Sequence, residues 1–367
     1  MASANPSHVQ QRRFARSIIP QADYKVATDV TDEANIVEFL VKDKNLTKTP
    51  VNTEDNKGDS NGHNWPTEDY VTTNETEVSH DLRVCSEEIG RDLLLAFGAV
   101  VVTVLTAAAA WKHKFTPLDI AVSKQLPAIT LVEIVGSGLN RLIPSLVVES
   151  FELKSEGAAG HVSAAVQYRG SGKVTTPSGI AVADIDAVRL SGLHYFTASM
   201  IKLVISDAGT LANGLTYGAA NRIDSFVFRV KNNLLNDQGY IPGDELYQTA
   251  DTPASGIIRS ELLVESQDFE LEINARFASQ SDQLAALRTR KELDVLAAWT
   301  GPVITGLHKH KLAVNAPRVR YEMVELGEKD NVVQVQLKCK LFFDTTLDYP
   351  AAVELSNAVE SYTEIPA

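Results

Sequence analysis

Cysteine is scarce in this chain. Its 367 residues include two cysteines, Cys85 and Cys339, and neither a CxxC pair nor the spacing of a zinc ribbon is present. The sequence therefore indicates no disulfide framework, and a reducing compartment is the expected setting. Cys85 also lies close to Glu87, whose negative charge disfavours a reactive thiolate.

The motifs of common catalytic sites are also missing. There is no GxSxG nucleophile elbow, no Walker phosphate loop and no HExxH zinc motif. His308 and His310, in HKHK, would share one face of a strand, but no further ligand set accompanies them in the sequence. We interpret them as solvated side chains, and we expect neither an enzyme nor a cofactor.

Basic residues are in the minority. Lysine and arginine total 34 against 47 aspartates and glutamates, which gives a formal net charge of −13 at pH 7. Such a chain repels nucleic-acid phosphates in bulk, which argues against sequence-specific DNA or RNA binding. The same charge suits a surface past which DNA moves without sticking.

Charge is absent altogether from residues 93–111. The length of this run is close to the roughly 20 apolar residues that cross a bilayer. Its composition favours two shorter elements: helix-forming residues up to Phe97, then Gly98, then a β-branched run over residues 100–104. A membrane-tethered extracellular β protein is the alternative that this run leaves open.

The first 64 residues differ in composition from the rest. The N-terminal MASANPSHVQQRRFARS lacks the apolar segment of a secretory signal, and residues 53–70 contain almost no aliphatic side chains. Such a composition cannot bury enough apolar surface to fold alone. We predict an extended polar arm over residues 1–64 and a folded domain over residues 65–367, with a disordered tail as the alternative to the arm.

Beyond the arm, the sequence has the two-residue period of β-strands. From Phe269 onward apolar and polar residues alternate, and residues 333–341 alternate in the same way. The glycines of SEGAAGH predict a hairpin connection, as does LGEKD. Strands are predicted over residues 146–154, 162–169, 201–206, 225–230, 257–277, 318–325 and 331–342.

Two segments have the features of helices. SEEIGRDLLLAFG offers Ser86 as an N-cap and Gly98 as a C-terminal stop. Residues 279–301 place leucines near helical spacing and are followed by Pro302. The fold class is therefore predicted to be mainly β (α+β), an antiparallel β-sandwich with a flanking α-helix.

The order of these pieces resembles the major tail tube proteins of tailed bacteriophages, which share a fold class with the tubes of contractile injection systems. The resemblance covers residues 65–365 and is carried by patterns, not by catalytic residues. These are VSHDLRV, SEEIGRDLLLAFGAV, HKFTP, LPAITLVEI, the hairpin IPSLVVESFELKSEGAAGHVSAAVQYRG, and PRVRYEMVELGEKDNVVQVQLKCKLFFD before VELSNAVESY.

The resemblance implies a structural virion protein of the phage tail, assembled in the host cytoplasm. Six-fold rings would join their sheets into an inner β-barrel and stack into a hollow tube through which DNA is ejected. The implied partners are further copies of the chain, the tape measure and terminator proteins, a sheath in a contractile tail, and passing genomic DNA without specific binding. No membrane, cofactor or metal is implied.

The resemblance also assigns roles to particular residues. The candidate lumen-facing residues are Asp268, Glu270, Glu272, Gln334 and Gln336, although Lys338 and Lys340 interrupt a purely acidic lining. The candidate inter-ring arm residues are Arg12, Arg13 and Arg16. The candidate core or interface residues are Leu94, Phe97, Val101 and Trp111.

Two further alternatives stay open. The same fold class serves other tail or neck components and the tube subunits of contractile devices. A carbohydrate-active enzyme on a β-sandwich is suggested only by plentiful carboxylates and by the aromatic residues Trp65, Tyr70, Trp111 and Trp299.

Overall fold

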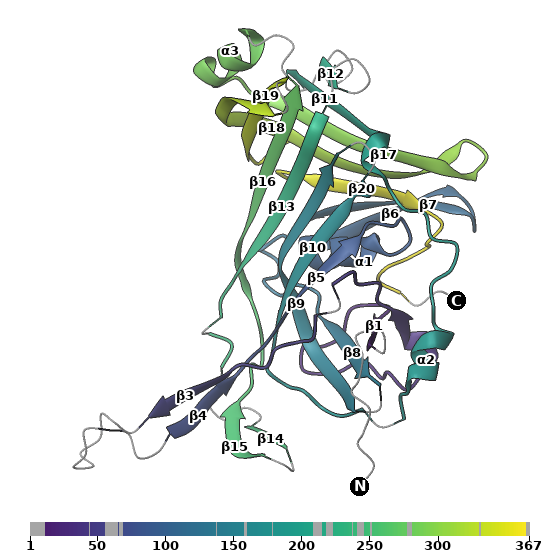
Figure 1. Ribbon diagram of the computed structural model, residues 1–367, viewed down its shortest axis with the longest axis vertical. Helices are drawn as coiled ribbons and strands as arrows, with labels where there is room; N and C mark the ends of the chain where they lie inside the picture. The colour runs from purple at the N-terminus through teal and green to yellow at the C-terminus, as the bar shows by residue number, and fades with distance from the viewer. Residues whose placement is uncertain are drawn as a thin grey trace.

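The structure is a computed structural model in which β-strands dominate and helices are few (Figure 1). It describes residues 12–43, 45–55, 65, 69–136, 138–157, 160–177, 179–207, 215–217, 223–236, 238–240, 246–249, 252–276, 281–329 and 332–364. Strand pairs in these residues are antiparallel, apart from one parallel bridge between β15 and β4. The prediction of a mainly β, antiparallel fold is confirmed.

The strands form two sheets. The larger sheet contains β1 (Arg12–Ser17), β2 (Ile36–Glu38), β5 (Thr76–Arg83), β6 (Gly98–Thr106), β7 (Ala110–Pro117), β8 (Ile129–Val135), β9 (Leu139–Glu156), β10 (Ser163–Gly170), β11 (Ile201–Asp207), β12 (Leu215–Tyr217), β13 (Ile223–Leu234), β16 (Val264–Arg276), β17 (Leu293–Thr305), β18 (His308–Lys329), β19 (Val332–Leu341) and β20 (Ala352–Asn357). The smaller contains β3 (Val51–Asp55), β4 (Asp69–Asn74), β14 (Leu246–Thr249) and β15 (Thr252–Ile257). The helices are α1 (Ile89–Phe97), α2 (Val182–Ala187) and α3 (Ser281–Thr289), with 3-10 turns η2 (Glu33–Asn35) and η4 (Ala198–Met200).

The larger sheet is open and branched. Its main order is β12-β11-β17-β18-β19-β16-β13-β9-β8-β1-β2, with β5 joined through β10 to β9, and β6 joined through β7 and β20 to β18. In Figure 1, β9, β13 and β16 run side by side along the long axis, whereas β17, β18, β20 and β7 cross them at an angle. Helix α1 contacts strands of both groups.

Branching arises where one long strand changes its partner. The first half of β9 pairs with β8, and the second half pairs with β10 and β13. The change falls at Pro144, which lacks an amide hydrogen, and at Ser145, whose φ is +62°. A bend of the strand at this point lets one chain segment serve two groups of strands.

The charge-free run of residues 93–111 divides as its composition predicted. Gly98 ends α1 with φ at +94°, and β6 follows it directly. Of the candidate core or interface residues, Leu94, Phe97 and Trp111 are buried, whereas Val101 is 60% exposed on β6. Among the described residues no helix is both long and apolar enough to cross a membrane.

Details of three predicted elements need correction. Helix α1 begins at Ile89 with Glu88, not Ser86, in the N-cap position. The long strand predicted over residues 257–277 is interrupted, because β15 ends at Ile257 and β16 begins at Val264; Phe277 lies outside the described residues. The hairpins β9–β10 and β18–β19 are confirmed.

The helix predicted over residues 279–301 is wrong in its second half. The chain leaves α3 at Arg290, whose φ is +51°, and forms β17 from Leu293. Alternate residues Val295, Ala297 and Trp299 then face the core, and β17 pairs with β11 and β18. The spacing of the apolar residues is compatible with both the helical period of 3.6 residues and the strand period of two. Pairing with neighbouring strands stabilises the strand.

The N-terminal segment belongs largely to the body of the protein. Strand β1 pairs with β8 and with β2 in the larger sheet, so the boundary predicted at residue 64 does not separate it from the domain. By contrast, all of β3 is exposed, and with β4 it projects from the body in Figure 1. Residues 1–11 and 56–64 of the predicted arm lie outside the described residues.

The prediction of an inter-ring role is wrong for Arg16, which is fully buried within the protomer. Its Nε donates to Glu88 Oε1 at 2.8 Å, and its Nη1 lies 2.5 Å from Asp92 Oδ1. Tyr168 donates its hydroxyl to the same Asp92 oxygen at 2.8 Å. Burial acts to lower the pKa of Arg16, but the charges of Asp92 and Glu88 outweigh it and raise the pKa above its ordinary value. The guanidinium therefore stays charged inside the core and joins β1 to α1 and β10.

Arg13 has a shallower environment on the same strand. Its Nε donates to Asp186 Oδ1 at 3.0 Å, and the two side chains are 24% and 38% exposed. Arg12 precedes it and pairs in register with Val135 of β8. Both residues therefore sit on a strand of the sheet, next to α2.

Replacing Arg16 by methionine tests the weight of its buried ion pairs. Arg16→Met leaves the fully buried Asp92 carboxylate without its cation and leaves Glu88 with Arg91 alone, so we expect a loss of about 3–5 kcal/mol in the free energy of unfolding. Arg13→Met is the matched control on the same strand, with an expected loss of less than about 1 kcal/mol. Urea denaturation measures both; equal losses would contradict the assignment of Arg16 as the anchor.

His113 on β7 predicts a pH dependence. Its Nε2 lies 2.8 Å from the carbonyl oxygen of Val359 and its ring is fully buried. Burial lowers the pKa of His113 below its ordinary value, so the unfolded chain binds a proton first as the pH falls. Its stabilising contribution is complete above the unfolded pKa of about 6.5 and is lost as pH falls below it.

We therefore expect the melting temperature to fall between pH 7.5 and pH 5.5, and to fall less in His113→Gln, which keeps a donor for Val359 but does not titrate. His161→Gln, at an exposed position, is the control. Calorimetry at several pH values measures the difference. The same pH slope in His113→Gln and in the unsubstituted protein would refute this account.

Candidate functional site

A polar face extends across β9, β13, β16 and β19. On β16, Glu270 lies directly opposite Arg229 of β13 on one side and Lys340 of β19 on the other. Glu272 lies opposite Lys338 in the same way. Residues directly opposite one another in antiparallel strands share a face, so these side chains form a charged array of alternating sign.

The five predicted lumen-facing residues all lie on this face. Gln336 donates to Glu272 Oε1 at 2.8 Å, Gln334 donates to Asp224 Oδ2 at 2.7 Å, and Asp268 accepts from Asn233 at 2.7 Å. The alternation of apolar and polar residues along β16 and β19 therefore identified the polar side of these strands correctly. Lys338 and Lys340 lie opposite Glu272 and Glu270 on the same face, so the face is of mixed charge and not purely acidic.

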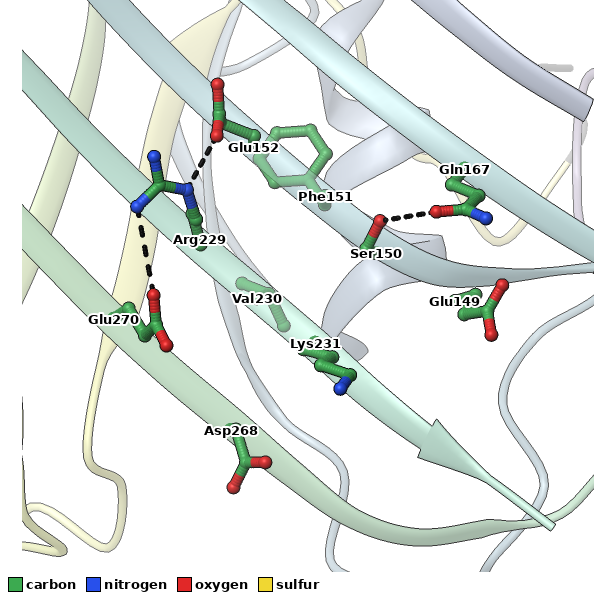
Figure 2. Close-up of a pocket in the computed structure, with 10 residues that line it drawn as sticks. All are labelled: Glu149, Ser150, Phe151, Glu152, Gln167, Arg229, Val230, Lys231, Asp268 and Glu270. Carbon is green, nitrogen blue, oxygen red and sulfur yellow. Dashed lines mark hydrogen bonds and ion pairs between the residues drawn. The ribbon is translucent and has the colours of Figure 1, made fainter.

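The face is hollowed between β9 and β16, where a depression of about 450 Å³ opens to solvent. Figure 2 shows Arg229 between Glu152 and Glu270, with its Nε 2.6 Å from Glu152 Oε2 and its Nη1 3.7 Å from Glu270 Oε2. The residues that line the hollow are Glu149, Ser150, Phe151, Glu152, Gln167, Arg229, Val230, Lys231, Asp268 and Glu270.

The hollow is built for charge pairing. Partial burial acts to lower the pKa of Arg229, but its hydrogen bond to Glu152 and the charges of Glu152 and Glu272 raise it above the ordinary value. The hydroxyl of Ser150 donates to Gln167 Oε1 at 3.3 Å, so its partner is a neutral amide oxygen. The arrangement suits an ordered, hydrated surface.

A second candidate surface is the outer edge of β6. This strand of nine residues, GAVVVTVLT, pairs with β7 on one side, and within the described ranges no strand pairs with its other side. Val101 and Val104 are each 60% exposed. An uncharged edge with free amide and carbonyl groups is a template for pairing with another chain.

The structure also corrects the prediction for the histidines of HKHK. His308 is half-buried, whereas His310 is 2% exposed and is not a solvated side chain. Its Nδ1 lies 2.8 Å from Ser86 Oγ, and its ring stacks on His194 with 4.1 Å between centroids. Burial, and then the neighbouring His194, lower the pKa of His310, which favours the neutral ring. Residues from distant segments surround it, so spacing in the sequence held no signal for this cluster.

Of the four aromatic residues that suggested a carbohydrate-active enzyme, two are buried, and the side chain of Tyr70 lies outside the part of the chain that the structure describes. Trp299 is fully buried and Trp111 is 6% exposed, so both belong to the core. Trp65 is 78% exposed, and one exposed tryptophan does not form a sugar-stacking cleft.

Neither protein-family models nor curated protein sequences match this chain. The resemblance to tail tube proteins thus stands on the residue patterns quoted above.

Replacing Arg229 tests how much the ion pairs of the polar face contribute to the stability of the protein. Arg229→Met breaks ion pairs whose members are 25–55% exposed, so we expect a loss of less than about 1 kcal/mol in the free energy of unfolding. Urea denaturation beside Arg16→Met, the buried counterpart, makes the comparison. A loss as large as that of Arg16→Met would mean that the ion pairs of the polar face stabilise the protein as much as the buried ones do.

Proposed function

We propose that this protein is a structural subunit that assembles with copies of itself into rings, as a tail tube protein of a bacteriophage does, with the virion tail as its location. The observation that carries the proposal is the open edge of β6 on a large antiparallel sheet. The patterns shared with the tail tube family supply the particular assembly, stacked rings around a channel for DNA.

Edge pairing gives a physical reason for assembly. A neighbouring copy that pairs with β6 would satisfy its free backbone groups and cover the exposed Val101, Val102 and Val104. If β6 meets a different edge of the next copy, the contact is heterologous and repeats until the rotation closes a ring. Sheets joined in this way form a continuous wall, for which the polar face supplies one side.

The polar face is suited to line a channel for DNA. Its cations lie beside carboxylates, as Lys338 does opposite Glu272, Lys340 opposite Glu270 and Lys231 opposite Asp268. Paired charges leave little positive potential to hold phosphates, and the formal net charge of the chain is −13. DNA would slide along such a wall without being bound.

The β3–β4 hairpin supports contact between rings. It projects from the body (Figure 1), and Glu54 and Asp55 at the end of β3 are exposed. An exposed strand such as β3 can add to a sheet edge or meet a basic surface of the next ring.

Electron microscopy of the purified protein, concentrated without detergent, tests the proposal together with size-exclusion chromatography. Hollow tubes or stacked six-fold rings are the expected result. Single rings that do not stack would favour the neck component, and binding of a sheath to the tube would favour the contractile device. A monomer at every concentration would refute self-assembly.

Lysine substitutions on β6 test whether its edge is the interface between copies. Lysines at Val101 and Val104 would have to be desolvated on pairing, so Val101→Lys/Val104→Lys should weaken association at least about tenfold, or about 1.4 kcal/mol. Val122→Lys, at a valine that is 83% exposed outside the edge, is the matched control. Light scattering measures the oligomeric state and circular dichroism confirms the fold; unchanged assembly in the double variant would show that β6 is not the interface.

A further inference from the structure

Three residues from distant parts of the chain converge beside the start of α1. Glu87 lies in the turn that precedes α1, His194 lies in the segment before η4, and His310 is on β18. Each offers one ligand atom, and these atoms lie within 4.8 Å of one another. Backbone contacts fix two of the segments against each other, because Ser86 donates its amide to the carbonyl of His194 at 2.9 Å.

The separations fit a small metal ion. His194 Nδ1 lies 2.8 Å from Glu87 Oε1, and His310 Nδ1 lies 3.7 Å from the same oxygen. Two ligand atoms each about 2.0–2.1 Å from a tetrahedral zinc ion are roughly 3.3 Å apart, a value between the two separations. Small side-chain rotations would place both nitrogens and the carboxylate around one ion.

The donor set and its surroundings also suit a metal. Two imidazoles and a carboxylate are a ligand set that zinc accepts. His310 is enclosed, Glu87 is 15% exposed, and the side chain of His194 is 41% exposed, so solvent reaches the cluster from the His194 side. The amide of His194 donates to Glu87 Oε2 at 2.9 Å and orients the carboxylate, as outer-shell hydrogen bonds do at metal sites.

We propose that Glu87, His194 and His310 bind a divalent transition-metal ion, with zinc as the ion that this set suits best. The ion would tie the start of α1 to β18 and to the segment before η4, and so act as a structural clamp. Ser86 Oγ, which lies 2.8 Å from His310 Nδ1, defines the rival state: a metal-free network in which hydrogen bonds alone join these groups. This site is separate from the β6 edge and from the polar face.

Calorimetric titration with zinc chloride, after dialysis against a chelator, distinguishes the two states. We expect one zinc per chain and a rise in melting temperature with zinc. His194→Gln and Glu87→Gln should each weaken binding at least about tenfold, whereas the control His308→Gln should not. Cobalt substitution gives a second readout, since a tetrahedral site with nitrogen ligands has intense visible absorption bands.

His194 is partly exposed, so His194→Gln is expected to fold, and circular dichroism verifies this. The absence of saturable zinc binding would overturn the proposal and establish the metal-free network. Equal affinity in His194→Gln and the unsubstituted protein would also overturn it, as would a loss of binding confined to His308→Gln. Titration of the Val101→Lys/Val104→Lys variant keeps this outcome independent of ring assembly.

Discussion

The buried guanidinium of Arg16 is the constraint around which the N-terminal half of the fold is arranged. A fully buried cation is tolerated only when it is paired and hydrogen-bonded, and Glu88 and Asp92 meet this need from the start of α1. Tyr168 completes the set from β10, and the guanidinium lies 4.4 Å from the ring centre of Phe39. The Arg16 side chain thus fixes the positions of β1, α1 and β10 relative to one another. If β1 left the body, the buried Asp92 would lose its cation and Glu88 would keep Arg91 alone.

The same constraint sets the position of the histidine cluster. Glu87 and Glu88 are adjacent, yet Glu88 turns inward to Arg16 while Glu87 turns toward His194 and His310. Because Arg16 fixes the backbone at this turn, the Glu87 carboxylate is already positioned next to His194 and His310. Preorganisation of this kind is what a metal site requires of its ligands, and it also makes the metal-free network rigid.

Sequence patterns correctly predicted the features that depend on neighbouring residues in the chain. Gly98 separated a helix from a β-branched strand within a run long enough to span a membrane, and alternation along β16 and β19 identified their polar face correctly. The failures involve partners remote in sequence. Arg16 lies 72 and 76 residues from its two carboxylates, and nothing near it indicated that an arginine in a polar segment would be buried. For β17, the leucine spacing fits a helix and a strand about equally well, and pairing with β11 and β18 stabilises the strand.

The edges of the larger sheet differ in how well they are protected against pairing with another chain. Natural proteins blunt open edges with short strands, charge or proline. At the ends of the main strand order, β2 and β12 are each three residues long. Strand β6 ends its branch with nine uncharged residues and no proline, and its valines project into solvent. The absence of charge over residues 93–111 thus falls on two different surfaces: α1 is enclosed by the core, and β6 is an uncharged edge that the proposed assembly would cover.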